Sequence, residues 1–233
     1  MYGQEMIDRW ERTLEKIQEA ISKSGRDKED VRLVAVSKLH PAQAVTELAK
    51  AGQKEFGENY AQEALQKQAE NDDPGLKWHF IGRLQTNKAK YLAGNFALIH
   101  SLDSLKMAQA LNKRLTDSNL RQPVLMQVNV ADEEQKGGVE AKDLFRIGLE
   151  IEKISGLDLQ GLMCMPPFFS DGEKSRPYFA RLREYKLQLE SRLDRGLEHL
   201  SMGMSADFAQ AIEEGATLLR IGTQIFGQRP DMV

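Results

Sequence analysis

Strand-like and helix-like segments alternate along the whole of this chain, and no other feature of the sequence limits its fold so strictly. Eight short apolar runs each precede a segment with helical periodicity or, for the last run, the C-terminal tail. The expected strands cover residues 33–37, 55–59, 77–82, 96–101, 123–130, 159–164, 199–202 and 217–221. Strict alternation requires parallel strands with the helices outside, because right-handed crossovers return each helix to the outer face.

The helices expected between these strands share apolar residues three or four positions apart. They cover residues 41–51, 60–70, a segment after Thr86, 104–115, 141–154, 176–192 and 206–214, and a further N-terminal helix ends at Gly25. Eight strand–helix units in 233 residues suit a closed barrel, which usually takes about 250 residues. We therefore predict one α/β domain over residues 1–233, a (β/α)8 TIM barrel with an extra N-terminal helix. A doubly wound open sheet is the structural alternative.

Charge and cysteine content exclude several classes of protein. A net charge of -3 argues against nucleic acid or an anionic membrane as partner, so a small solute is expected. Cys164 is the single cysteine, which excludes an internal disulfide, and four scattered histidines give no metal-ligand spacing. No apolar run approaches the roughly 20 residues of a membrane span, and the N-terminus lacks a signal-peptide core. We expect a cytoplasmic monomer without a metal.

Lys38 directly follows the first expected strand and precedes Leu39-His40-Pro41, where a strand has to stop. In barrels and in open parallel sheets, ligands bind at the carboxyl ends of the strands. Burying a lysine there lowers the pKa of its amine toward the range in which it attacks a carbonyl. The ordinary alternative is a lysine whose charge simply reaches water. Three further polar residues lie in or after other strands, where each could equally be a turn or core residue: Asn59, His79 and Asn129.

The loops after the last two strands carry small and hydroxyl residues. Ser201, Gly203 and Ser205 surround the end of the seventh strand, and Gly222-Thr223 follows the eighth. Barrels that bind phosphate often use these two loops. The alternative is an ordinary helix start with Ser205 as N-cap. No glycine pattern of a dinucleotide or nucleoside triphosphate site is present.

A lysine at one strand end and a phosphate site at another suggest a phosphorylated aldehyde held as a Schiff base. Pyridoxal 5'-phosphate fits this description. A class I aldolase would use the same residues on a sugar phosphate, so these elements alone leave the ligand open.

Six segments together resemble the pyridoxal phosphate homeostasis proteins, the YggS/PROSC family. They are residues 34–41, 56–60, 78–88, 161–166, 200–205 and 220–227. The likeness runs in the right order over nearly the whole chain. It implies a barrel like the N-terminal domain of alanine racemase, a pyridoxal phosphate cofactor bound covalently to Lys38, and a role in vitamin B6 homeostasis.

The resemblance also implies roles for individual residues. Ser205, Gly222 and Thr223 match phosphate contacts, and Ser201 and Met204 match them less closely. Arg220 matches an arginine that faces the pyridine nitrogen of the cofactor, although an arginine there could also form a structural ion pair. Asn59 and His79 match signature positions near the cofactor, without an assigned role.

Two functions follow from the resemblance. A binding protein would hold pyridoxal phosphate reversibly and supply it to apo-enzymes, with no catalytic residues. A racemase or lyase of the alanine racemase type would instead need acid–base groups on both faces of its substrate. Lys38 could serve one face, but the second needs a tyrosine that alanine racemase takes from an additional β-domain, which does not follow Val233 here. Tyr60 is the internal candidate for that role. We expect a carrier and not an enzyme.

Overall fold

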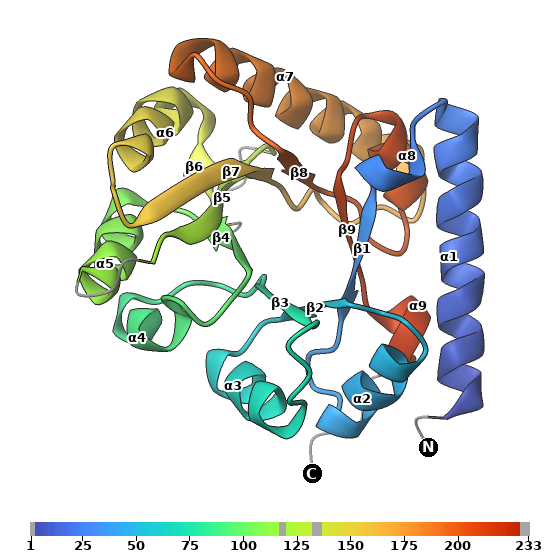
Figure 1. The fold of residues 1–233 in the computed structure, drawn as a ribbon. Helices are drawn as coiled ribbons and strands as arrows, with labels where there is room; N and C mark the ends of the chain where they lie inside the picture. The colour runs from blue at the N-terminus through green and yellow to red at the C-terminus, as the bar shows by residue number, and fades with distance from the viewer. Residues whose placement is uncertain (1–2, 117–119, 132–136, 229–233) are drawn as a thin grey trace.

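The strands of this computed structural model close into a parallel barrel (Figure 1). The structure describes residues 3–116, 120–131 and 137–228. The sheet order in this part of the chain is β4-β3-β2-β1-β9-β8-β7-β5-β6, and pairing of β4 with β5 completes the closure. The strands are β1 (Arg32–Val36), β2 (Glu55–Glu58), β3 (Lys77–Phe80), β4 (Leu98–Leu102), β5 (Gln122–Asn129), β6 (Val139–Glu140), β7 (Leu157–Met163), β8 (His199–Ser201) and β9 (Leu218–Ile221). The predicted barrel is confirmed, and the open sheet is excluded.

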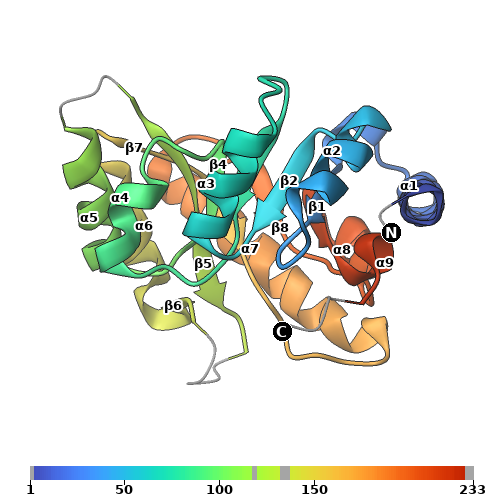
Figure 2. The same cartoon turned by 90° about the horizontal axis from the view of Figure 1, so that it is seen from below.

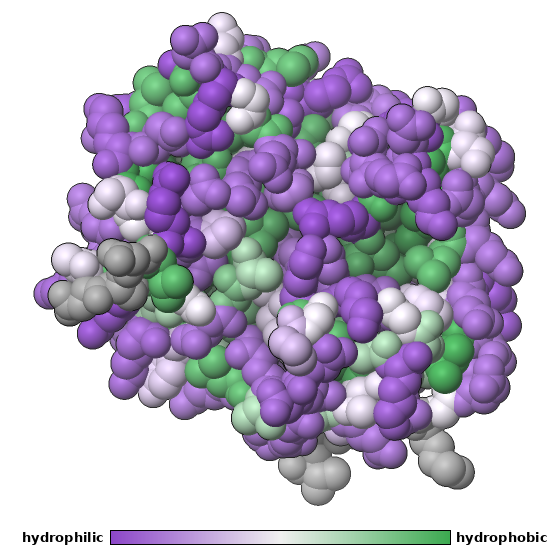
Figure 3. All heavy atoms as spheres, viewed as in Figure 1, coloured by the Kyte–Doolittle hydropathy of each residue, from purple (hydrophilic) through white to green (hydrophobic). Residues whose placement is uncertain are grey.

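Helices surround the sheet on its outer side (Figures 1 and 2). They are α1 (Gln4–Ser24), α2 (Ala42–Lys50), α3 (Ala61–Glu70), α4 (Ala89–Leu92), α5 (Leu105–Leu115), α6 (Leu144–Glu152), α7 (Arg176–Leu193), α8 (Phe208–Glu213) and α9 (Thr223–Phe226). Polar residues cover most of the face seen in Figure 3, with apolar patches between them. No helix in the described ranges is long and apolar enough to cross a membrane.

The structure departs from the sequence prediction in short elements. The pattern did not predict β6 or α9, because two to four residues are too few to show a period. The helix predicted to start at residue 206 begins at Phe208, since the Asp207 carboxylate accepts from the Met204 backbone N–H at 2.7 Å and closes a turn first.

Helix α1 packs outside the barrel against α8 and α9. Its buried side includes Met6, Trp10 and Ile17, as the apolar spacing in the sequence requires. Gly25 ends the helix at φ 69°, a left-handed conformation that glycine adopts without steric cost. Arg9 also donates from Nε to the Ile225 carbonyl at 2.9 Å, which ties α1 to α9.

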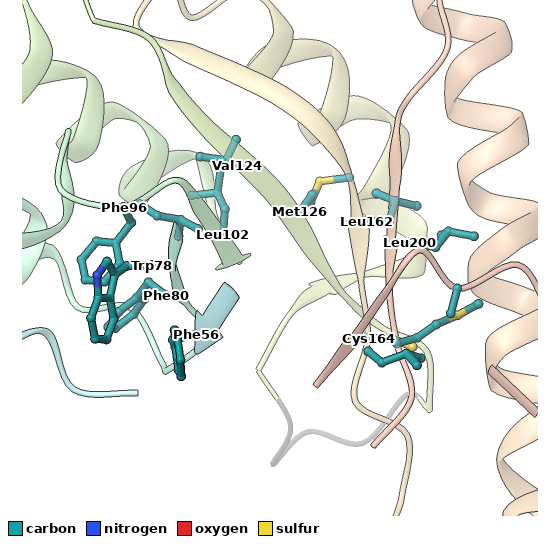
Figure 4. Close-up of a cluster of buried hydrophobic side chains, with 14 of the residues drawn as sticks. Phe56, Trp78, Phe80, Phe96, Leu102, Val124, Met126, Leu162, Cys164 and Leu200 are labelled. Carbon is teal, nitrogen blue, oxygen red and sulfur yellow. The ribbon is translucent and has the colours of Figure 1, made fainter. Parts of the chain in front are cut away.

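The main core lies between the sheet and the helices, and Figure 4 shows part of it. Phe56, Trp78, Phe80 and Phe96 gather near β2 and β3, with Phe80 and Phe96 edge to face at a centroid distance of 5.4 Å. A second, small cluster contains Val34, Leu98, Leu125, Met163 and Leu218, one residue from each of five strands. Leu98 lies two residues from His100 on β4 and pairs with His79 on β3, and Leu218 lies two residues from Arg220 on β9, so these side chains point to the same face of the sheet. The second cluster therefore fills the barrel interior.

Candidate ligand-binding site

A cavity of about 180 Å³ opens at the carboxyl ends of the strands. Seven of the nine predicted site residues line it: Lys38, Asn59, Met204, Ser205, Arg220, Gly222 and Thr223. His79 and Ser201 do not line it, and Asn129 at the end of β5 does not line it either. The fold therefore brings together residues that are up to 185 positions apart in the sequence, from Lys38 to Thr223.

Four lining residues carried no sequence signal of a site: Val36, His40, Ile81 and Met165. His40 is buried and stacks on Phe226 at a centroid distance of 5.1 Å. Each belongs to a segment on which the family resemblance rests, but neither spacing nor chemistry distinguished it from its neighbours.

Lys38 lies half-buried in the turn that follows β1, two residues beyond the last strand residue, Val36. The preceding Ser37 N–H still donates to the Gly57 carbonyl at 3.1 Å, as a strand residue would. The chain leaves the sheet immediately afterwards. Strand pairing therefore fixes the backbone up to Ser37, and Lys38 depends on other contacts.

A second lysine, Lys67 on α3, lies close to the same turn but is fully engaged. Its ammonium donates at 2.7 Å to the Ser37 carbonyl, to Glu58 Oε1 and to Glu63 Oε1. An ammonium has three N–H donors, and all three are used. The Lys67 amine is thus buried among these three acceptors and lies outside the cavity lining. The geometry thus makes Lys38, which lines the cavity, the better nucleophile of the two.

The residue after Lys38 has an unusual backbone conformation. Leu39 lies at φ 64°, one of two non-glycine residues with positive φ in the described ranges. This conformation costs a side chain other than glycine roughly 1–2 kcal/mol. The Leu39 N–H donates to Glu63 Oε1 at 2.6 Å, which offsets part of this cost.

Arg220, on β9, is a buried cation at the cavity wall. It donates from one terminal nitrogen to Ser201 Oγ at 2.5 Å and from the other to the Cys164 carbonyl at 2.9 Å. Burial lowers the pKa of its guanidinium, opposed by Cys164 and Asp207. Arg220 forms no ion pair with any residue that the structure describes, so these contacts do not support a structural ion pair. A buried cation without a paired carboxylate suits an electron-rich group of a ligand.

Ser201 links Arg220 to a chain of polar residues across the barrel interior. His100 Nδ1 lies 2.8 Å from Ser201 Oγ, and His100 Nε2 lies 2.8 Å from His79 Nδ1. His79 Nε2 lies 3.4 Å from Glu55 Oε2. Arg220 can only donate, so Ser201 Oγ accepts from it. The direction of the contacts from Ser201 to His100 and from His100 to His79 depends on the histidine tautomers, and the His79–Glu55 contact is a proximity of charges without a hydrogen bond. His79 and Ser201 thus reach the cavity through Arg220.

The histidines of this chain predict how stability depends on pH. Burial lowers the pKa of His79 and lowers that of His100 well below its usual value. Both therefore take up a proton less readily in the folded protein than in the unfolded chain, whose histidines are protonated below about pH 6.5. The free energy of unfolding should therefore fall as the pH is lowered below 6.5, by roughly 1.4 kcal/mol per pH unit for each fully buried histidine. Denaturant titration at pH 7 and pH 5 measures the slope.

Other groups modify this slope in known directions. Burial also lowers the pKa of His199 to about 4, with a smaller effect on stability because solvent screens this residue. Burial raises the pKa of Glu58, which opposes the fall in stability. His100→Gln keeps one donor and one acceptor but cannot ionise. The slope of its free energy of unfolding against pH should therefore be smaller by the contribution of one histidine. Equal slopes for the variant and the wild type would show that His100 is not the buried neutral group.

The loops after β8 and β9 meet beside Arg220. The Arg220 N–H donates to the Gly203 carbonyl at 3.0 Å, and Gly203 lies at φ 91° with Ala211 Cβ only 2.6 Å from where its own Cβ would be. Only glycine fits there. Ser205 is exposed in the turn before α8, and the N-cap position of this helix is Asp207, so the alternative that Ser205 caps it is wrong. Thr223 begins α9, where first-turn amides lack helical acceptors. Ser205 and Thr223 thus line the same cavity from the loops after β8 and β9.

Asn59 follows β2 and has a buried side-chain oxygen, Oδ1, without a hydrogen-bond partner in the described ranges. Buried polar atoms are nearly always paired in proteins. Asn59 lines the cavity, so a ligand donor there would satisfy this oxygen.

A scan of protein-family models matches residues 7–230 to the alanine racemase N-terminal domain. The pyridoxal phosphate homeostasis protein of Aquifex aeolicus is 48% identical over 225 residues, covering 95% of this chain and 97% of the relative.

Solved structures show the same likeness. PipY of Synechococcus elongatus PCC7942, in its structure with pyridoxal phosphate bound, is 36% identical with a TM-score of 0.80, covering 91% of this chain and all of PipY. Alanine racemase of Clostridium difficile has a TM-score of 0.74 at 14% identity, over 94% of this chain and 57% of the racemase, and shows a common fold.

Proposed function

Since this chain belongs to the alanine racemase N-terminal domain family and, within it, to the pyridoxal phosphate homeostasis proteins, we propose that it binds pyridoxal 5'-phosphate reversibly and supplies it to apo-enzymes. One observation carries the proposal. A single cavity joins a strand-end lysine, a buried arginine that pairs with no carboxylate in the described part of the chain, and two hydroxyl-bearing loops. These are complementary to an aldehyde, a ring nitrogen and a phosphate.

The residues fit this ligand group by group. Lys38 would bond covalently to the aldehyde carbon, and Ser205, Gly222 and Thr223 would hold the phosphate. Arg220 would face the pyridine nitrogen with Asn59 beside the ring, and Met204 would lie near the phosphate. The unpaired Asn59 Oδ1 supports a ligand donor at that position. Ser201 and His79 would act on Arg220 and not on the ligand directly.

Arg220 would limit the chemistry that the bound ring supports. When bound, pyridoxal phosphate can act as an electron sink, most strongly with its ring nitrogen protonated. An arginine does not readily release a proton to that nitrogen, whereas a carboxylic acid does. Arg220 has no acceptor atom and already donates to Ser201 and to the Cys164 carbonyl. Beside it, the ring would be a weaker electron sink than beside a carboxylic acid.

The cavity also offers few groups for acid–base work on a substrate. Among its described lining residues, Lys38, His40 and Arg220 are the titratable ones. Tyr60, the internal candidate for a second acid–base group, is 54% exposed and lines a neighbouring cavity instead. A racemase or lyase remains the second candidate function, and hydrogen exchange on an added amino acid separates it from a carrier.

Replacing Arg220 with glutamate should increase that exchange. The carboxyl group would favour a protonated ring nitrogen, so an added L-amino acid should exchange its α-hydrogen in deuterated water faster than with wild type. Proton NMR measures this rate, and chiral analysis of the wild-type mixture detects any D-isomer. Rapid racemisation by the wild type would favour the enzyme. A variant that keeps its ligand and its absorbance spectrum, without faster exchange, would show that Arg220 does not control the ring.

A further inference from the structure

The ion cluster around Lys67 contacts the backbone on both sides of Lys38 while lying outside the cavity lining. Lys67 donates to the carbonyl of Ser37, and Glu63 accepts from the N–H of Leu39. Both side chains come from α3, four residues apart, and bond to one another at 2.7 Å. One helix therefore fixes the backbone immediately before and after Lys38.

This cluster is itself held by the sheet. Glu58, the last residue of β2, is fully buried and accepts from both Lys67 Nζ and Ser37 Oγ at 2.7 Å. Ser37 is thus held through its carbonyl and its hydroxyl. Lys38 lies between this anchored residue and the left-handed Leu39. Left-handed leucine persists only where surrounding contacts impose it, and the bond to Glu63 is such a contact.

We propose that Glu63 and Lys67 are positioning residues that aim the Lys38 amine at the aldehyde of its ligand, an inference that rests on the proposed function. The neutral amine nitrogen bonds to the aldehyde carbon, and the aldehyde oxygen leaves as water with the two amine protons. The reaction needs the nitrogen close to the carbon and correctly oriented. Lys38 lies beyond the strand ladder, so its direction depends on the backbone at residues 37–39.

Two ligands separate positioning from ordinary structural support. Pyridoxal 5'-phosphate can bond to Lys38, whereas pyridoxine 5'-phosphate carries an alcohol in place of the aldehyde and cannot. Both have the same ring and phosphate. A loss of general stability would weaken both, whereas misdirection of Lys38 would affect only the aldehyde.

Glu63 is the better position to change, because removing Lys67 would leave Glu58 buried without its counter-charge. In Glu63→Ala, covalent attachment of pyridoxal phosphate, followed by absorbance, should slow about 10-fold to 100-fold. Pyridoxine phosphate should keep its affinity. Glu63→Gln should recover most of the rate, because its amide oxygen still accepts from Leu39. Glu63→Asp is too short to reach Leu39 and should resemble alanine, although it keeps the charge.

Hydrogen exchange of the Leu39 amide in the ligand-free protein gives a second readout, since it should be faster in Glu63→Ala and Glu63→Asp than in Glu63→Gln. Glu152→Ala, which breaks the two-oxygen pair with Arg195 away from the cavity, serves as control and should change neither attachment nor this exchange. Equal weakening of both ligands, or an unchanged attachment rate in Glu63→Ala, would overturn the positioning role. If wild type forms no covalent bond, the proposed function fails and this inference with it.

Discussion

Lys38→Ala should abolish covalent attachment of pyridoxal phosphate. With this ligand, the wild type is expected to show the absorbance band of a Schiff base at about 420 nm. Borohydride reduction should remove this band. The variant should show neither the band nor its loss, because Lys67, the other lysine near this turn, directs its three N–H donors at other groups and does not line the cavity. Absorbance spectra before and after reduction measure the effect.

Lys88→Ala is the matched control, since Lys88 lines the neighbouring cavity and not the one that contains Lys38. It should leave both the band and the reduced product unchanged. A Lys38→Ala protein that still gives the band would mean that another amine carries the ligand.

The phosphate group should dominate the noncovalent affinity. Each charge-assisted hydrogen bond from the loops after β8 and β9 contributes about 1.5–3 kcal/mol, roughly 10-fold to 150-fold in affinity. Pyridoxal, which lacks the phosphate, should therefore bind at least about 100-fold more weakly than pyridoxal phosphate if two such bonds are lost. Equilibrium titration followed by absorbance gives both dissociation constants.

Thr223→Val separates the side chain from the backbone at this position. It removes one hydroxyl from the cavity lining and keeps the main-chain amide. It should weaken pyridoxal phosphate and leave pyridoxal unchanged. Equal affinity of the wild type for the two ligands would refute a phosphate anchor in this cavity.

The barrel could be predicted from sequence because its signal is repeated eight times. Each strand run is short and ambiguous alone, but only parallel strands with outer helices accommodate their strict alternation. The positions of Lys38 and Arg220 followed from this topology together with the family resemblance. Both line the one cavity that also contains Ser205 and Thr223.

The supporting contacts could not be predicted, because they join residues that share no pattern. His79 and His100 are 21 positions apart and meet only when β3 and β4 pair. Lys67 reads as an ordinary helix residue, yet it is buried beside Glu58. Leu39 is not a glycine, so the sequence does not indicate its left-handed backbone. Such contacts depend on tertiary geometry and not on local preference.

The identity of the receiving apo-enzymes, a monomeric state and a cytoplasmic location stay predictions from the sequence. Within the described ranges, the structure shows no group of three His, Cys, Asp or Glu residues that could hold a metal. The single cysteine, Cys164, is buried, which raises the pKa of its thiol to about 12 and keeps it protonated.

Peptide mapping of the wild-type protein, reduced with borohydride after incubation with pyridoxal phosphate, tests the central claim most directly. Mass spectrometry should find the pyridoxyl group on one lysine, Lys38, at one group per chain. Its presence mainly on Lys67 or Lys88, with Lys38 unmodified, would contradict the assignment of the cavity as a covalent pyridoxal phosphate site.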